Sequence, residues 1–448
     1  MDLRFLLAGA VVLAAVAGCV DDDATPDETP VTATVTWPAG PHSHPAYGYP
    51  VSEDLPAAGT DVDGLPAAWR QIPPAALPDA MSQLVHRGQV SGTPSGAGIA
   101  TFGPYAYVGT YNTNQFAAVD ISDPEAPVVA SVMTDARAGD TDLIAYPDGR
   151  LVAVASSRGA NLFVIDVTDP YNMTLLSVID TPHGNHNHAV VPGTPIVYNN
   201  DSSGAGGATD IWDLSDPENP VLVQDWANGY GCHASSFYIN ATEGKFRGYC
   251  AGIKVTQIWD VTDPLDPSVI VDIPWPTGGV DTGGQIPAAS PATFAHLAMP
   301  NHDGTVLIVG DETGGGAAPG CDAYVEVPVT GTTVTGPLGN IWFYDISDEA
   351  DPVLHGGYSP AAWEQKGSCT AHFGGVIEDT NHLVMAYYTA GVVLVDFNDI
   401  DNPRAVDIWS RTEADGPCTL CGVWDAQYYN GYVFTGDVDR GMDVLTIE

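Results

Sequence analysis

The fold is decided by the stretch Phe116-Ala117-Ala118-Val119-Asp120-Ile121-Ser122-Asp123-Pro124-Glu125-Ala126-Pro127, an apolar run followed by two aspartates and two prolines. Its second half, from the first aspartate to the last proline, returns as Asp213–Pro220 and as Asp260–Pro267. Three altered copies begin at Asp166, Asp345 and Asp396. A truncated copy, Met442–Leu445, ends the series, so the sequence contains seven related units.

The spacing of the units predicts their architecture. Their first aspartates lie at positions 120, 166, 213, 260, 345, 396 and 443, which are 46, 47, 47, 85, 51 and 47 residues apart. A period of this length accommodates four short strands, and four-stranded units that repeat radially form a propeller. The one long spacing is a period plus an insertion, which we place at residues 314–339. We therefore predict an all-β, seven-bladed β-propeller over residues 81–448.

Within a unit, the strands are predicted to follow one another as A, B, C and D from the inside outward. In the third unit these are the β-branched or apolar segments His188–Val191, Ile196–Tyr198, Thr209–Asp213 and Val221–Gln224. The Asp-Pro element then forms the turn from C to D, because proline presets φ and the aspartate side chain can accept hydrogen bonds from following amides. A calcium loop is the alternative for these turns, but they lack the further carboxylates of an oxygen cage.

The last unit lacks a D strand of its own. Residues 83–90, upstream of the first unit, resemble a D strand, and we expect them to pair with residues 442–447 and close the ring. A D strand starts on the face of the C-to-D turns. The chain should therefore enter the propeller on the face opposite to the starts of the A strands.

The units resemble the LVIVD-repeat family of bacterial and archaeal surface propellers. The copies most like the family's motif are Leu162-Phe163-Val164-Ile165-Asp166 and Val393-Leu394-Val395-Asp396. The resemblance covers about residues 80 to 448. It implies the propeller fold and supplies no catalytic residues.

The N-terminus has the features of an export signal. Arg4 precedes the apolar run Phe5–Ala17, which is too short to span a bilayer comfortably. The segment Val16-Ala17-Gly18-Cys19 resembles the bacterial lipobox, which implies that residues 1–18 are a signal peptide and that Cys19 is lipidated. A signal peptide without lipidation is the alternative.

The segment after Cys19 has the composition of a tether. Residues 19–61 are rich in Pro, Thr, Ala and Asp without periodic apolar positions, so we expect them to be disordered; residues 62–80 form a lead-in segment. Aspartate does not directly follow Cys19, so the inner-membrane retention signal of enterobacteria is absent. We therefore predict a lipid anchor in the outer membrane or at the cell surface.

The net charge of the protein limits the classes of partner that it can bind. The formal net charge is −43, with only 13 Lys and Arg residues, which excludes nucleic acid and anionic lipid as partners. We interpret the acidic residues mainly as a solvated surface. The expected partners are the membrane, through the lipid on Cys19, and an unidentified extracellular ligand or protein, bound by a monomer.

The six cysteines after Cys19 suit an oxidising compartment. Cys232 and Cys250 flank a turn-like segment symmetrically, so we predict a disulfide across an A–B hairpin with Cα atoms within about 7 Å. Cys418 and Cys421 form a CxxC pair, which a disulfide explains and a zinc or redox site would explain as well. The pair that then remains is Cys321 with Cys369.

A histidine recurs at the start of the innermost strand in four consecutive units: His188, His233, His296 and His372. Since A strands surround the axis of a propeller, these side chains are predicted to converge, and together they could hold a transition metal such as Fe, Cu or Zn. Asp142 and Asp425 occupy the same place in two other units and could bind the metal or orient the rings. The alternative is that polar residues here only hydrogen-bond the loops of neighbouring blades.

Two classes of function follow. The leading hypothesis is a lipid-anchored surface propeller that acts as a binding or scaffold module, since a Ser nucleophile elbow, a Walker loop, a dinucleotide fingerprint and HExxH are all absent from the sequence. The alternative is a metal-dependent enzyme, such as an oxidoreductase, that uses the four histidines. By analogy only, carotenoid cleavage oxygenases carry four axial histidines on a seven-bladed propeller, although their helical dome has no counterpart here.

Overall fold

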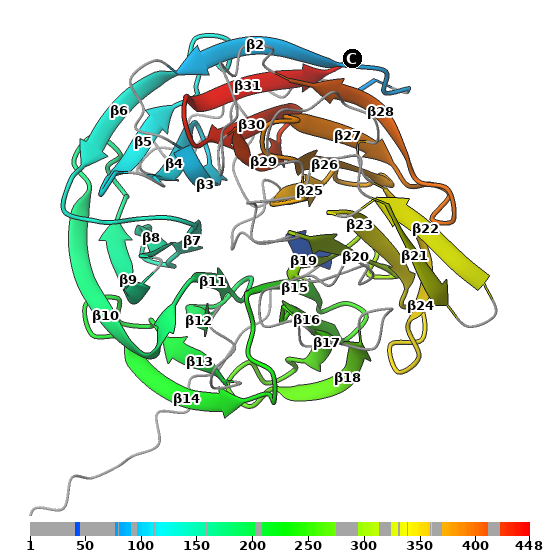
Figure 1. The fold of residues 1–448 in the computed structure, drawn as a ribbon. Helices are drawn as coiled ribbons and strands as arrows, with labels where there is room; N and C mark the ends of the chain where they lie inside the picture. Colours follow the sequence, from blue (N-terminus) through cyan, green and yellow to red (C-terminus); the bar gives the residue numbers. More distant parts are fainter. Residues whose placement is uncertain are drawn as a thin grey trace, which may run out of the picture. The chain divides into compact units, whose positions relative to one another are not determined.

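The computed structural model describes residues 41–44, 77–78, 80–90, 96–110, 113–157, 159–201, 208–253, 255–274, 294–312, 324–329, 332–337, 339–358, 360, 370–410 and 422–448. All of them belong to one compact unit, Thr36–Glu448. Within them, seven four-stranded antiparallel blades surround one axis, as Figure 1 shows. The predicted seven-bladed β-propeller is confirmed.

The first three blades are regular. Blade one consists of β3 (Gly96–Phe102), β4 (Tyr105–Thr110), β5 (Phe116–Asp120) and β6 (Val128–Met133). Blade two consists of β7 (Thr141–Ala145), β8 (Leu151–Ser156), β9 (Gly159–Asp166) and β10 (Thr174–Asn185). Blade three consists of β11 (Asn187–Val190), β12 (Ile196–Asn200), β13 (Ala208–Asp213) and β14 (Val221–Ala227).

The next three blades follow the same plan, and extra strands accompany blades four and five. Blade four consists of β15 (Ala234–Asn240), β16 (Lys245–Ala251), β17 (Val255–Asp260) and β18 (Ser268–Pro274). Blade five consists of β19 (Ala295–Pro300), β20 (Val306–Asp311), β23 (Ile341–Asp345) and β24 (Val353–Tyr358). Blade six consists of β25 (Gly374–Val376), β26 (His382–Ala386), β27 (Val392–Asp396) and β28 (Arg404–Trp409). Within the region predicted as an insertion, β21 (Tyr324–Val329) and β22 (Thr332–Pro337) form an antiparallel pair of their own.

The seventh blade joins the two ends of the propeller. It consists of β29 (Val423–Tyr429), β30 (Tyr432–Asp437), β31 (Gly441–Ile447) and the N-terminal β2 (Leu84–Val90). Leu84 lies opposite Ile447 and Val90 opposite Met442, as the predicted closure requires. The amides of Ser82 and Gln83 both donate to the carbonyl of Glu448, so the chain enters β2 beside the end of a C strand, on the face of the C-to-D turns.

The Asp-Pro elements form the predicted turns, because each aspartate accepts an amide two residues further on. In blade one, Asp120 Oδ1 accepts from the amide of Ser122 at 2.9 Å and Asp123 Oδ1 from that of Glu125 at 3.2 Å. The same pair of bonds recurs in blades two to six, at Asp166, Asp169, Asp213, Asp216, Asp260, Asp263, Asp345, Asp348, Asp396 and Asp399. Local hydrogen bonding of this kind explains the repeat without a bound cation.

The hydrophobic core is divided between the blades. Among the described residues, seven buried clusters occur, and six of them each lie between two consecutive blades. The seventh lies between blades five and six and extends to residues of blades one, four and seven. Inner strands such as β4 and β8 are therefore buried along their whole length, since both of their faces contact a neighbouring blade. The outer strand β6, by contrast, leaves Val128 57% exposed.

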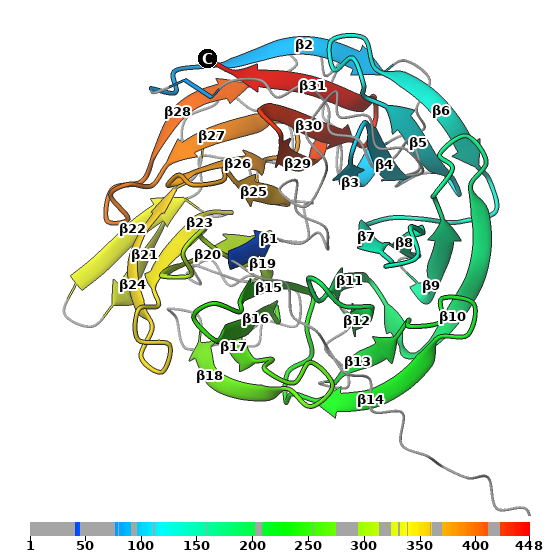
Figure 2. The same ribbon diagram turned by 180° about the vertical axis from the view of Figure 1, so that it is seen from behind.

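One further strand lies at the inner edge of blade four. β1 (Pro41–His44) pairs antiparallel with β15, with Pro41 opposite Asn240 and His44 opposite Phe237 (Figure 2). These four residues belong to the segment that the composition predicts to be disordered. No helix among the described residues is long and apolar enough to cross a membrane.

The predicted disulfide between Cys232 and Cys250 is confirmed, with Cα atoms 5.6 Å apart. The predictions for five other cysteines lie outside the described residues: Cys19, Cys321, Cys369, Cys418 and Cys421.

Candidate functional site

The four predicted histidines are found where the sequence pattern places them, at the start of the inner strands. His188 is the second residue of β11 and His296 the second of β19, while His233 immediately precedes β15 and His372 stands two residues before β25. All four are buried, with 1–2% of their surface exposed.

Three of these histidines form a continuous row of rings. The ring centroids of His233 and His296 are 4.4 Å apart, and those of His296 and His372 are 4.1 Å apart. The row continues at one end to His186, 4.4 Å from His233, and at the other to Trp424, 3.9 Å from His372. Neighbouring blades therefore bring imidazoles from distant parts of the sequence into direct contact.

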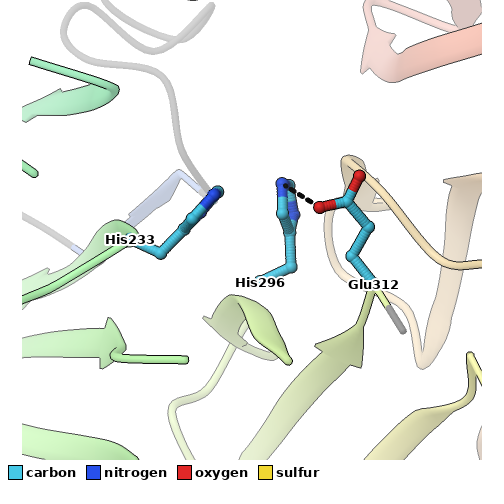
Figure 3. A group of neighbouring side chains, drawn as sticks. All are labelled: His233, His296 and Glu312. Atoms are coloured by element: carbon cyan, nitrogen blue, oxygen red, sulfur yellow. Dashed lines mark ion pairs between the residues drawn. The ribbon is translucent and has the colours of Figure 1, made fainter. Parts of the chain in front are cut away.

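An acidic residue, Glu312, lies beside this row of histidine rings. Glu312 directly follows β20, and its side chain is 7% exposed. Its Oε2 lies 3.5 Å from Nε2 of His296, and its Oε1 lies 3.6 Å from Nε2 of His372. Figure 3 shows the carboxylate facing His296, with the ring of His233 on the far side of that histidine. Ligand atoms of His233, His296 and Glu312 all lie within 4.8 Å of one another.

The distances from the Glu312 carboxylate to His296 and His372 are longer than hydrogen bonds. An N–H···O bond spans about 2.7–3.2 Å. Two ligand atoms bound tetrahedrally to one zinc ion, at bond lengths of about 2.0–2.2 Å, lie about 3.4 Å apart. The distances of 3.5 and 3.6 Å from Glu312 to the two histidines match the second geometry.

The orientation of His372 also suits a ligand. Its Nδ1 lies 2.7 Å from the carbonyl oxygen of Trp424 in the next blade. A carbonyl can only accept, so Nδ1 carries the proton, and in the neutral ring Nε2 keeps its lone pair. Histidines that bind metals are commonly fixed in this way, with the second nitrogen hydrogen-bonded to a carbonyl or carboxylate.

His188 has a different role from the other three. Its Nε2 lies 2.9 Å from the carbonyl oxygen of Val154 in blade two. Burial lowers the pKa of His188 to about 4, and the hydrogen bond to Val154 opposes part of that shift. Among the described residues, no ring contact joins His188 to the other histidines. For this residue the alternative interpretation, a hydrogen bond to a neighbouring blade, describes the geometry.

The two aspartates predicted to support the histidines also connect blades. Asp142 Oδ2 accepts the amide of Val190 at 2.9 Å and lies 3.7 Å from Nε2 of His188. Asp425 Oδ2 accepts the amide of Ile99 at 3.0 Å, across the junction between the last and first blades.

Three residues of this site were not predicted as parts of it. The phenol of Tyr388 donates a hydrogen bond to Oε1 of Glu312, and the rings of Tyr388 and Trp424 both contact His372. Glu312 was recognisable in the sequence only as an acid in a loop on the same face as the histidines. Tyr388 carries no motif that could have indicated this position.

Among known proteins, two solved structures are similar to this chain at low sequence identity. The chain is similar to the crystal structure of the Saccharomyces cerevisiae Sqt1, with a TM-score of 0.46 and 9% identity over 80% of this chain and 83% of that chain. It is also similar to the crystal structure of RRP9 WD40 repeats, with a TM-score of 0.49 and 10% identity over 82% of this chain and 99% of that one. No family model matches the sequence, and no curated protein does.

Proposed function

We propose that this protein is an exported, lipid-anchored propeller that binds a divalent transition-metal ion at Glu312. His233 and His296 belong to the group whose ligand atoms lie within 4.8 Å of one another, and His372 would bind from the side of the other carboxylate oxygen. The observation that carries the proposal is the position of the Glu312 carboxylate, 3.5 and 3.6 Å from the Nε2 atoms of two histidines. Three imidazoles and a carboxylate are a ligand set that Zn, Fe and Cu accept, whereas calcium prefers oxygen ligands. This makes the metal the ligand of the predicted binding module.

The burial of the Glu312 carboxylate gives independent support for a bound metal ion. The glutamate and the histidine row are almost entirely removed from solvent. A buried carboxylate is costly unless positive charge compensates it, and two histidines and a tyrosine are among the side chains that face Glu312. A dication would supply that charge.

The test uses the purified full-length protein, dialysed against zinc and analysed for bound metal, with cobalt as a spectroscopic substitute. Glu312→Gln should lower zinc affinity at least about tenfold and abolish the visible absorption of tetrahedral cobalt. The exposed Glu218→Gln, on the C-to-D turn of blade three, is the matched control. Equal zinc affinity and an unchanged cobalt spectrum in Glu312→Gln, with the fold intact, would contradict the proposal.

A metal-dependent oxidoreductase is the second candidate, and one observation favours it. Two oxidisable side chains contact the proposed ligands: Tyr388, bonded to Glu312, and Trp424, packed on His372. In protein loaded with iron or copper and treated with hydrogen peroxide, an organic radical detected by electron paramagnetic resonance should be lost in Tyr388→Phe. The absence of such a radical with both metals would contradict the oxidoreductase.

The sequence supports two further parts of the proposal, the lipid anchor and the LVIVD-repeat family. The apolar run that ends at Cys19 supports lipidation and display at the outer membrane or cell surface, and the repeat of seven units supports membership of the LVIVD-repeat family. Incorporation of a labelled fatty acid in the producing cells should occur in the natural chain and fail in Cys19→Ser. Equal incorporation in both would remove the anchor from the proposal.

A further inference from the structure

A second group of possible metal ligands lies where blade two meets blade three. His183 stands near the end of β10, the outer strand of blade two. Asp210 belongs to β13 and Asp225 to β14, the two outer strands of blade three. One ligand atom from each of the three residues lies within 4.8 Å of the others. The group shares no residue with the site around Glu312.

The two aspartates are direct neighbours in the sheet. Asp210 lies opposite Asp225 in the ladder between β13 and β14. Like charges directly opposite one another destabilise a β-sheet. Asp210 is only 1% exposed, so water screens its charge poorly. Among the described residues, the ion pairs to these two aspartates come from His183 rather than from lysine or arginine.

The hydrogen bonds leave one buried oxygen directed into the group. Oδ2 of Asp210 accepts from the side-chain amide of Asn199 at 3.0 Å. Its other oxygen, Oδ1, is buried and has no hydrogen-bond partner among the described residues. That oxygen lies 3.8 Å from Nε2 of His183, and the same nitrogen lies 2.9 Å from Oδ2 of Asp225. A buried carboxylate oxygen without a donor requires an explanation, and an ion is one.

We propose that His183, Asp210 and Asp225 form a second binding site for a divalent metal ion of the zinc or manganese class. The ion would take Nε2 of His183 and one oxygen from each aspartate, and it would neutralise the opposed carboxylates. One imidazole with two carboxylates suits these metals better than calcium, which is held by oxygen atoms alone.

Solvent can reach this site, unlike the one beside Glu312. The side chains of His183 and Asp225 are 33% and 51% exposed. Three protein ligands with the remaining positions open to water are typical of metal sites that exchange ligands or contact a substrate, whereas structural sites are closed by four. This ion would therefore be the more readily exchanged of the two.

The experiment counts zinc ions on the full-length protein by equilibrium dialysis and elemental analysis. His183→Gln and Asp225→Asn should each lose one equivalent of zinc, or at least about tenfold in affinity for it. Asp180→Asn is the control, because Asp180 is exposed on the same strand, β10, outside the group. Glu312→Gln should remove a different equivalent, so the double variant with His183→Gln should lose both.

A proton could neutralise the group instead, with His183 as an imidazolium between the aspartates. To separate the two, the ¹⁵N resonances of His183 are followed during a zinc titration in the Glu312→Gln background. Binding at His183 should move its Nε2 resonance. An imidazolium spectrum that zinc does not change, or a wild-type zinc content in His183→Gln, overturns this proposal and leaves the one at Glu312 untouched.

Discussion

Nε2 of His188 in β11 lies 2.9 Å from the carbonyl oxygen of Val154, which belongs to β8 of the preceding blade. Since the carbonyl accepts, Nε2 carries the proton, and the ring is neutral when Nδ1 is unprotonated. The side chain is fully buried, and this burial lowers the pKa of His188 to about 4. Two blades are thus joined by a histidine that has to stay neutral.

The stability of the propeller should therefore depend on pH through His188. In the unfolded chain its pKa is the ordinary 6.5, so between pH 6.5 and about 4 the unfolded state binds a proton that the folded state does not. Stability then falls as the pH falls, and the difference of about 2.5 pKa units corresponds to about 3 kcal/mol. The advantage of the natural protein over His188→Gln should shrink by about this amount between pH 7 and pH 4.

Urea unfolding of both proteins across this range gives the measurement, and the titration of the many other acids cancels in the difference. The carboxylate of Asp142, 3.7 Å from Nε2, also faces the ring. Its attraction for an imidazolium would narrow the pH range over which the stability falls. A difference in unfolding free energy that is constant with pH would show that His188 is not a buried neutral group.

The closing strand makes a second prediction. Val90, the last residue of β2, is 1% exposed, whereas Val128 at the start of β6 is 57% exposed. Val90→Ala removes buried methyl groups and should lower the free energy of unfolding by about 2 kcal/mol. Val128→Ala, the same change on an outer strand, should stay within about 0.5 kcal/mol. Denaturation curves that rank the two variants equally would mean that β2 does not hold the ring closed.

The fold was predictable because its signals are local and repeated. Each turn such as Asp120–Pro127 is made by side chains that accept amides two residues away, so its chemistry is visible in a short window. The fixed spacing of the turns then gives the number of blades. β1 was not predictable in this way, because its pairing with β15 depends on contact between distant segments and its four residues show no strand pattern.

The site was only partly predictable, for a related reason. Alignment of the units places His188 and His372 at equivalent positions. It does not predict which of the two ring nitrogens forms a hydrogen bond with the neighbouring blade. One ring turns toward Val154 and the other toward Trp424 and Glu312. Glu312 comes from the loop after β20, whose length differs from blade to blade, so the repeat carries no information about it.

The row of histidines gives the third prediction, at His372. Its Nδ1 lies 2.7 Å from the Trp424 carbonyl, and its Nε2 lies 3.6 Å from Glu312. In metal-free protein with ¹⁵N-labelled histidine, long-range ¹H–¹⁵N spectra should therefore show Nδ1 of His372 protonated at every pH at which the protein is folded. Zinc should move the Nε2 resonance and leave Nδ1 protonated, because the backbone bond to Trp424 is kept when the metal binds. In Glu312→Gln the tautomer should persist while the response to zinc weakens, which separates the hydrogen bond from the metal site. A ring protonated only at Nε2 would contradict both the orientation of His372 and its assignment as a ligand.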